Sequence, residues 1–230
     1  YEDQSLVIGH YRPYTKQWLY FNRKFNETVY QLPKIFPQGG SKNQLIVVTG
    51  NGESVPFSTL IVDAIPDFKT HYNSQCFPLY LYDEPNEEAR DEPNQGGLFS
   101  SLSPAQPVRK RRDAITDEGL AHFNAAYPGG SISKEDLFYF VYGLLHSPDY
   151  RERYADNLGK ELPRIPRVKS ASDFWAFSRA GRKLADLHLN YETVPMYDGA
   201  KIEHGGKPLT DADYRVEKMK YGKNGKDKDL

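Results

Sequence analysis

The sequence is poor in the residues that carry covalent and metal chemistry. One cysteine, Cys76, stands in 230 residues, which excludes an internal disulfide and fits a reducing compartment. The six histidines are dispersed, so no spacing typical of a zinc site occurs. No apolar run is long enough to cross a bilayer. We therefore expect a cytoplasmic protein that binds neither a structural metal nor a membrane.

Catalytic patterns are missing as well. There is no Gly-x-Ser-x-Gly nucleophile elbow, and Cys76 lies among aromatic neighbours, as a structural thiol does. The stretches Gly39–Lys42 and Gly50–Gly52 lack the ending and the following helix of a phosphate loop, so we interpret them as turns. His146 falls near a predicted helix end, where an imidazole can favour the helix dipole. The residues indicate no catalytic set and no metal site, which disfavours an independent hydrolase or nuclease.

What the sequence does contain is aromatic mass and unevenly placed charge. It has 17 Tyr and 12 Phe, which can supply a core and leave polar tips at interfaces. The formal net charge is only −1, yet residues 83–92 are acidic while Arg109–Arg112 and residues 218–228 are basic. Since local faces rather than totals set the potential, a near-neutral chain can still carry a positive surface.

The first half of the chain is predicted to be rich in strands. The first 36 residues suit a short strand or turn followed by irregular structure. Gln44–Thr49 and Phe57–Val62 are β-branched runs separated by turn residues, so they predict a hairpin or a strand pair with a longer loop. Phe77–Tyr82 predicts a third strand, with Pro78 at its start or on an edge. Residues 83–113 hold many prolines and glycines and predict a linker or long loop.

The second half is predicted to be helical. Side chains that suit N-caps mark four helix starts: Thr116, Ser133, Ser147 and Ser170. Ser133 with Asp136 forms a capping-box pattern, and Pro148 suits a first helical position. The apolar side of the last helix is expected to carry five residues: Phe174, Phe177, Leu184, Leu187 and Leu189. A final short strand is predicted over residues 214–221.

These patterns predict an α+β fold, with a small mostly antiparallel sheet region followed by a helical region. We divide it into a β-rich part over 1–82, a linker or long loop over 83–113, and a mainly helical part over 114–230. The chain begins without Met and closes in a Gly/Lys/Asp-rich stretch. We therefore expect a segment of a larger protein that is truncated at its C-terminus.

Several long phrases of the sequence occur together in a known family. The longest runs from Phe138 to Tyr154 and continues to Pro166, and it closely resembles the carboxy-terminal specificity domain of type ISP restriction–modification enzymes. Supporting phrases stand in the family's order: Tyr11–Tyr14, Trp18–Tyr20, Cys76–Tyr82 and Tyr214–Met219. One departure is Tyr14-Thr15 where the family has Phe-Asp. Tyr14 can still pack as the family's Phe does, but Thr15 offers no carboxylate in place of the family's Asp.

The resemblance implies that this chain is one segment of a very large bacterial enzyme. Members join a nuclease, an ATPase motor, an adenine-directed DNA methyltransferase and a target-recognition domain. This chain would be the target-recognition part, with double-stranded DNA and the methyltransferase domain as partners. The parent enzyme would use S-adenosylmethionine, ATP and Mg²⁺, and this segment no cofactor of its own. Loops of the β part would enter the major groove, while the helices support them.

Candidate DNA-binding residues are the polar and basic side chains of the predicted loops. They are Lys42, Asn43, Asn51, Arg109, Lys110, Arg111 and Arg112. Four successive cations can neutralise phosphates, although a solvated charge cluster has the same appearance. We interpret Phe138–Pro166 mainly as scaffold, in which Arg151 and Arg153 either face DNA or serve helix ends. The alternative function is an interaction module that docks neighbouring domains without reading DNA.

Overall fold

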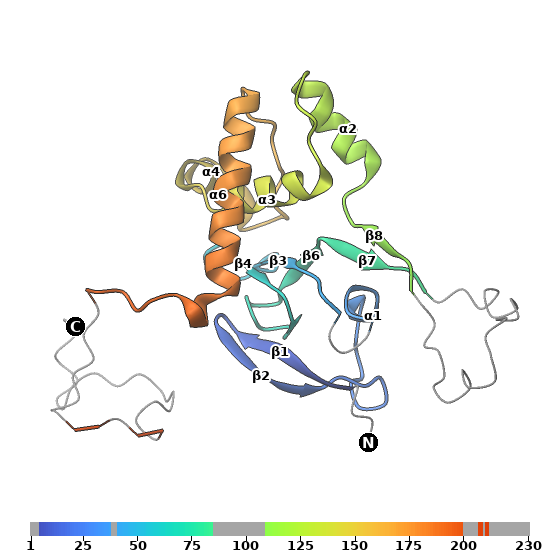
Figure 1. Ribbon diagram of the computed structural model, residues 1–230, viewed down its shortest axis with the longest axis vertical. Helices are drawn as coiled ribbons and strands as arrows, with labels where there is room; N and C mark the ends of the chain where they lie inside the picture. Colours follow the sequence, from blue (N-terminus) through green and yellow to red (C-terminus); the bar gives the residue numbers. More distant parts are fainter. Residues whose placement is uncertain (1–4, 38–40, 85–108, 200–206, 209, 212–230) are drawn as a thin grey trace, which may run out of the picture. The chain divides into compact units, whose positions relative to one another are not determined.

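The computed structural model describes residues 5–37, 41–84, 109–199, 207–208 and 210–211 (Figure 1). The chain divides into two compact units, Tyr1–Thr193 and Val194–Leu230, and every element below belongs to the first. Both the strands and the helices therefore lie in one unit, on either side of the stretch predicted as a linker. Among the described residues, no helix is both long and apolar enough to cross a membrane.

The strands form three small sheets, ordered β2–β1–β5, β4–β3–β6 and β7–β8. Neighbouring strands are antiparallel except β1 and β5, which are parallel. The α+β fold with mostly antiparallel strands is confirmed. Their bounds are β1 (Leu6–Arg12), β2 (Thr15–Tyr20), β3 (Leu45–Val48), β4 (Thr59–Val62), β5 (Ile65–Pro66), β6 (Gln75–Pro78), β7 (Tyr80–Tyr82) and β8 (Arg111–Asp113).

The sheet β4–β3–β6 lies at the centre, and its strands β3 and β4 are buried on both faces. Because side chains alternate along a strand, Ile46 and Val48 of β3 join the core beneath the helices. Leu45 and Val47 join a second core with β1, β2 and the short helix α1 (Leu32–Ile35). All four side chains of β3 are buried. Burial on both faces explains why this strand is a continuous aliphatic run rather than an alternating one.

Several strand boundaries differ from those expected. The predicted pair over 44–62 exists with the longer loop, and the third strand is interrupted at Leu79. Its first part, β6, pairs with β3, while its second part, β7, pairs with β8. The stretch 83–113 therefore ends in a strand, and the first 36 residues contain a full hairpin, β1–β2. The strand predicted over 214–221 lies outside the described residues.

The helices begin where the caps predict. Thr116, Ser133, Ser147 and Ser170 each accept a hydrogen bond from a backbone N–H of the first turn. Ser133 and Asp136 form the full capping box. The helix bounds are α2 (Asp117–Ala126), α3 (Lys134–Leu145), α4 (Pro148–Arg153), α5 (Ala155–Leu158) and α6 (Ala171–Leu189), followed by a 3₁₀ turn, η4 (Tyr191–Thr193).

Helices α3 and α6 cross with their backbones in contact. At the crossing, Gly143 faces Gly181, and a Cβ atom on either residue would collide with backbone atoms of the other helix. The buried face of α6 consists of Phe174 and three small residues, including Gly181. Leu187, which was expected on the apolar side, is instead 50% exposed. Small residues rather than a leucine stripe therefore set the distance between these helices.

A tyrosine hydroxyl joins the helices to the central sheet. Tyr142 of α3 is fully buried, and its oxygen accepts a hydrogen bond from the Ile61 N–H on the edge strand β4 at 3.1 Å. Its hydroxyl lies 2.5 Å from Nδ1 of His188. The ring of Tyr14 packs edge-on against His188 and so ties the β1–β2 turn to the end of α6. The residue that replaces the family's Phe therefore keeps a packing role.

The segment recognised in the sequence supplies much of this scaffold. Tyr150 and Tyr154 pack against each other with ring centroids 5.0 Å apart. Arg151 Nε donates to the Leu145 carbonyl at 2.7 Å and so closes the end of α3. Arg153 is exposed beside the ring of Tyr154. Of the two roles considered for Arg151, the structure therefore gives it the helix-end role.

His146 departs from its expected role. It is the C-cap of α3, but burial and the neighbouring Arg151 lower its pKa to about 4. The ring is therefore neutral at physiological pH and does not act on the helix dipole as a cation. Its Nε2 atom is buried without a hydrogen-bond partner among the described residues.

We expect Gly181→Ala to destabilise the protein by about 3 kcal/mol, because the added methyl group must push α3 and α6 apart. The matched control is Gly119→Ala in α2, where a Cβ atom meets its neighbours at ordinary contact distances of 3.4 Å or more. Urea denaturation monitored by circular dichroism compares the two. Equal midpoints for both variants would contradict the tight crossing.

The buried neutral His146 makes stability depend on pH. Its pKa is about 4 in the folded protein against an ordinary value of 6.5, so the unfolded chain takes up the proton first. The contribution of the neutral His146 ring to the free energy of unfolding is fully present above pH 6.5. It falls by roughly 1–2 kcal/mol between pH 6.5 and about 4, after allowance for solvent screening. Denaturation midpoints across this range should fall less for His146→Gln. The exposed His122, replaced by Gln, should leave the wild-type profile unchanged.

Candidate nucleic-acid interface

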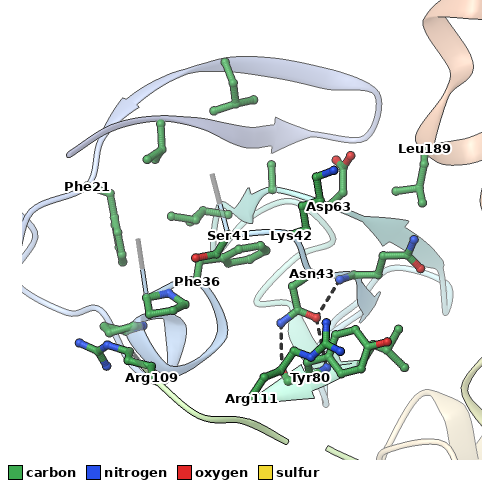
Figure 2. Close-up of a pocket in the computed structure, with 18 of the residues that line it drawn as sticks. Phe21, Phe36, Ser41, Lys42, Asn43, Asp63, Tyr80, Arg109, Arg111 and Leu189 are labelled. Carbon is green, nitrogen blue, oxygen red and sulfur yellow. Dashed lines mark hydrogen bonds between the residues drawn. The ribbon is translucent and has the colours of Figure 1, made fainter. Parts of the chain in front are cut away.

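An open groove of about 1400 Å³ runs between the strand layer and the helices (Figure 2). Its walls come from β1, β2, α1, the loop before β3, the β7–β8 ribbon and the end of α6. Arg109 and Arg111 lie along one edge in Figure 2, and Leu189 of α6 lies at the opposite end. Aromatic side chains contribute to the lining: Trp18, Phe21, Phe36, Tyr80 and Tyr139.

The strand geometry of β8 divides the cluster of four cations. Because successive side chains of a strand point to opposite sides, Arg109 and Arg111 line the groove while Lys110 and Arg112 do not. The Arg111 guanidinium lies over the Tyr80 ring at 4.2 Å, which fixes its position. Arg112 Nε pairs with Asp83 Oδ1 at 3.0 Å across the ribbon. Two of the four predicted cations are therefore available to a ligand in the groove.

Asn43 has a structural function in the groove wall. It is only 4% exposed, and its Nδ2 donates to the carbonyl groups of Ile35 and Tyr80. Its Oδ1 accepts from the backbone N–H groups of Gln44 and Tyr80. The amide thus holds α1 and β7 against β3 and leaves no group to contact a base. Lys42, its neighbour, is exposed and lines the groove.

Asn51 lies elsewhere on the surface. It is exposed on the turn between β3 and β4, and the described lining of the groove does not include it. The preceding Gly50 donates its N–H to the Tyr72 carbonyl at 3.0 Å. A side chain at Gly50 would collide with the backbone of Asn73, so the turn is packed against the loop after β5. The structure therefore does not bring Asn51 together with Lys42, Arg109 and Arg111.

The charges in the groove are mainly positive. Its lining contains six cationic side chains: Arg23, Lys24, Lys42, Arg109, Arg111 and Arg182. The three acidic ones are Asp63, Glu135 and Asp186. The His10 ring, whose Nε2 lies 3.8 Å from Asp63 Oδ1, is the main influence that lowers the pKa of Asp63. Arg23 and Lys24 were not among the residues predicted from the sequence, and the fold places them in the lining of the same groove as Arg109 and Arg111.

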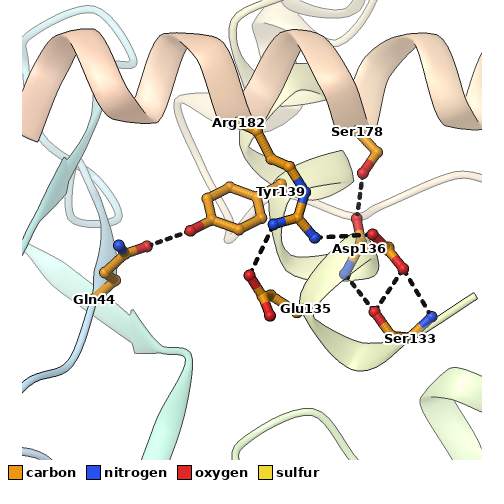
Figure 3. Close-up of polar contacts among 7 residues, drawn as sticks. All are labelled: Gln44, Ser133, Glu135, Asp136, Tyr139, Ser178 and Arg182. Atoms are coloured by element: carbon orange, nitrogen blue, oxygen red, sulfur yellow. Dashed lines mark hydrogen bonds and ion pairs between the residues drawn. The ribbon is translucent and has the colours of Figure 1, made fainter.

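Arg182 is the one groove cation whose charge is compensated by ion pairs within the part of the chain that the structure describes (Figure 3). Its guanidinium donates to Glu135 Oε1 at 2.7 Å and to Asp136 Oδ1 at 2.8 Å, and it lies over the Tyr139 ring. The Tyr139 hydroxyl continues the network by donating to Gln44 Oε1 at 2.8 Å. This network links α3 and α6 to the strand β3, so it supports the groove rather than supplying free charge to it.

Two features expected of a catalytic centre, a metal-binding cluster and a reactive thiol, are not seen among the described residues. Within the ranges that the structure covers, no three His, Cys, Asp or Glu side chains are grouped to hold a metal ion. Burial raises the pKa of the Cys76 thiol to about 12, so it is protonated and a poor nucleophile at neutral pH. What the site offers is shape, aromatic surface and fixed positive charge.

Comparison with known families gives the class of protein, which is a specificity domain of restriction enzymes. The chain belongs to the Type ISP C-terminal specificity domain family, whose model matches residues 1–230. No match was found among curated proteins.

Several solved structures are similar to this chain, and the chain spans only 13–17% of the length of the three described below. The ATP-dependent Type ISP restriction-modification enzyme LlaBIII bound to DNA is 34% identical over 98% of the chain, with a TM-score of 0.74. A nuclease-deletion mutant of LlaGI with a DNA substrate mimic is 34% identical over 98%, with a TM-score of 0.70. The DrdV–DNA complex is 36% identical over 84%, with a TM-score of 0.70.

We expect Asn43→Asp to destabilise the protein by about 3 kcal/mol, because a buried carboxylate would face the two carbonyl groups that the amide now donates to. The control is Asn51→Asp on the exposed turn, which should change stability by less than about 0.5 kcal/mol. Thermal and urea unfolding report both values. A full-stability Asn43→Asp variant would contradict the structural role of this amide.

Proposed function

We propose that this chain recognises the DNA target of a type ISP restriction–modification enzyme through the groove and the β7–β8 ribbon. The observation that carries the proposal is the pair Arg109 and Arg111, held on one side of an exposed ribbon and facing a cationic groove. Support comes from the family and from three similar enzymes, each solved with DNA or a DNA mimic.

A two-stranded β-ribbon has the dimensions to enter the major groove of DNA. In this arrangement Arg111 and Arg109 approach base edges, where arginine binds guanine in a bidentate manner. Arg23, Lys24 and Lys42 lie on the other walls of the groove and contact phosphates, which fixes the register of the protein on the duplex. The helices hold these walls in place through Tyr139 and its network.

We infer the chemistry of the parent enzyme from its family. Methylation of adenine, ATP-driven movement and cleavage belong to other segments of that enzyme, together with its need for S-adenosylmethionine, ATP and Mg²⁺. The domain works beside the methyltransferase domain in the cytoplasm of a bacterium. The chain itself supplies recognition and no catalytic step.

A second candidate function is docking of neighbouring domains without DNA reading. The hairpin β1–β2 favours it, because Leu6, Ile8 and Trp18 are 39%, 37% and 69% exposed on the same face. Apolar side chains gathered on one surface mark protein contacts more often than isolated ones do. These three side chains also line the groove, so a docked domain and DNA would compete for this surface. The effect of the ribbon cations on DNA binding separates the two functions.

The test reverses charge on either side of β8 in the full-length protein. We expect Arg109→Glu with Arg111→Glu to weaken binding to DNA by at least about tenfold, because two cations facing the duplex become anions. Because Arg109 and Arg111 are assigned to base edges, the preference for the selected duplex over a scrambled one should also fall. Fluorescence anisotropy with duplexes selected from a randomised pool measures both quantities.

The matched control is Lys110→Glu with Arg112→Glu, which changes the net charge equally on the side turned away from the groove. We expect it to reduce affinity much less and to leave the selected sequence unchanged. If both double variants bind DNA like the unaltered protein, the recognition function is refuted and the docking function remains. If both weaken binding equally, the groove is not the DNA site.

A further inference from the structure

The turn after β2 is held rigidly by one asparagine. Asn22 accepts hydrogen bonds at its carbonyl from the N–H groups of Phe25 and Asn26, at 2.9 and 3.0 Å. Its Oδ1 accepts from the Lys24 N–H at 3.0 Å, and its Nδ2 donates to Ser5 Oγ at 3.2 Å. Its own N–H donates to Asn26 Oδ1 at 2.9 Å. Turns closed in this way by asparagine side chains have little conformational freedom left to lose on binding.

This rigid turn presents a large apolar side chain to solvent. Phe25 is 74% exposed, although burial of such a ring is worth about 2–3 kcal/mol. One edge of the ring rests on Tyr20 of β2, with centroids 5.6 Å apart and the planes at 74°. Phe25 is therefore supported from one side while its remaining surface is open.

Phe25 is not itself part of the described groove lining, but the three residues before it in the chain are. Asn22, Arg23 and Lys24 all line the groove, and the two cations are exposed. A single exposed apolar residue is common on proteins and by itself indicates nothing. Here the ring projects from a stiff turn, directly next to two cations that face the same space as Arg109 and Arg111. An exposed aromatic ring next to two cations fits a ligand that has negative charges on its outside and stacked apolar rings within, as a nucleic acid has.

We propose that Phe25 is a wedge that enters a base step of the DNA, while Arg23 and Lys24 bind the flanking phosphates. This inference rests on the proposed function, since it needs DNA in the groove. Apolar wedges of this kind partly unstack neighbouring base pairs and kink the duplex. The wedge contributes specificity through the deformability of the step it enters, because pyrimidine–purine steps open more readily than others. The turn Asn22–Asn26 thus reads DNA shape, whereas the β7–β8 ribbon reads base edges.

The experiment places 2-aminopurine at successive positions of a duplex selected from a randomised pool by the full-length protein. Unstacking by Phe25 should raise the fluorescence of 2-aminopurine at one step. We expect Phe25→Ala to abolish that rise and to weaken binding about tenfold, with an unchanged salt dependence because no charge is altered. Phe25→Leu, which keeps an apolar wedge, should retain most of the signal.

A matched control removes a different exposed phenylalanine that also neighbours a lysine. Phe68 is 51% exposed beside Lys69, and Lys69 does not line the groove, whereas Arg23 and Lys24 beside Phe25 do. Phe68→Ala should leave both the fluorescence and the affinity unchanged. Circular dichroism confirms that each variant is folded before binding is measured.

The outcomes separate this inference from the function on which it rests. If Arg109→Glu with Arg111→Glu abolishes binding while Phe25→Ala changes neither fluorescence nor affinity, the recognition function stands and the wedge is refuted. If Phe25→Ala disturbs only the association with other segments of the polypeptide, Phe25 is a docking residue and the wedge is refuted as well. Loss of the signal at one step in Phe25→Ala, with retention in Phe25→Leu and Phe68→Ala, establishes the wedge.

Discussion

The fold depends on a central sheet whose two faces must both be covered. Every side chain of β3 is buried, and its neighbours on β4 are buried as well, so neither face can be left to water. The helices cover one face, and the hairpin β1–β2 with α1 covers the other. Tyr142 adds a directional constraint, because its hydroxyl satisfies an edge N–H of β4 that lies under the helices. The central sheet therefore determines where all other elements lie.

The groove is a consequence of how the covering layers meet. Near the groove, short elements such as α1 and β7 lie against β3. The Asn43 amide joins them by forming hydrogen bonds with four backbone groups. A buried amide with several backbone hydrogen bonds holds its partners rigidly, because any displacement leaves a buried polar group without its partner. The cations on the walls are thus carried by a fixed framework, which favours recognition by preorganised charge over adaptation to the ligand.

The sequence predicted those parts of the fold in which a single residue type has one strong local consequence. Aliphatic runs located the central strands, and caps such as Ser133 located the helix starts, because a hydroxyl there has one obvious acceptor role. The role of Asn43 could not be predicted this way, since an amide side chain can form hydrogen bonds with a base edge or with backbone groups equally well. The role of Gly143 depends on a partner 38 positions away, and the place of Arg23 in the lining of the same groove as Arg109 follows only from the fold. Contacts between residues far apart in the chain leave no pattern in the local sequence, so they could not be predicted from it.

The run of four cations before and within β8 has an evolutionary consequence. A strand that slips by one residue exchanges its two sides, which normally ruins a binding surface. In this chain such a slip would withdraw Arg109 and Arg111 and present Lys110 and Arg112 instead, with the same charge and altered geometry. Under the proposed function, such a slip would still leave two cations facing the DNA while changing the geometry of their contacts. The proposed recognition site could therefore change its target sequence and keep its positive charge toward the duplex.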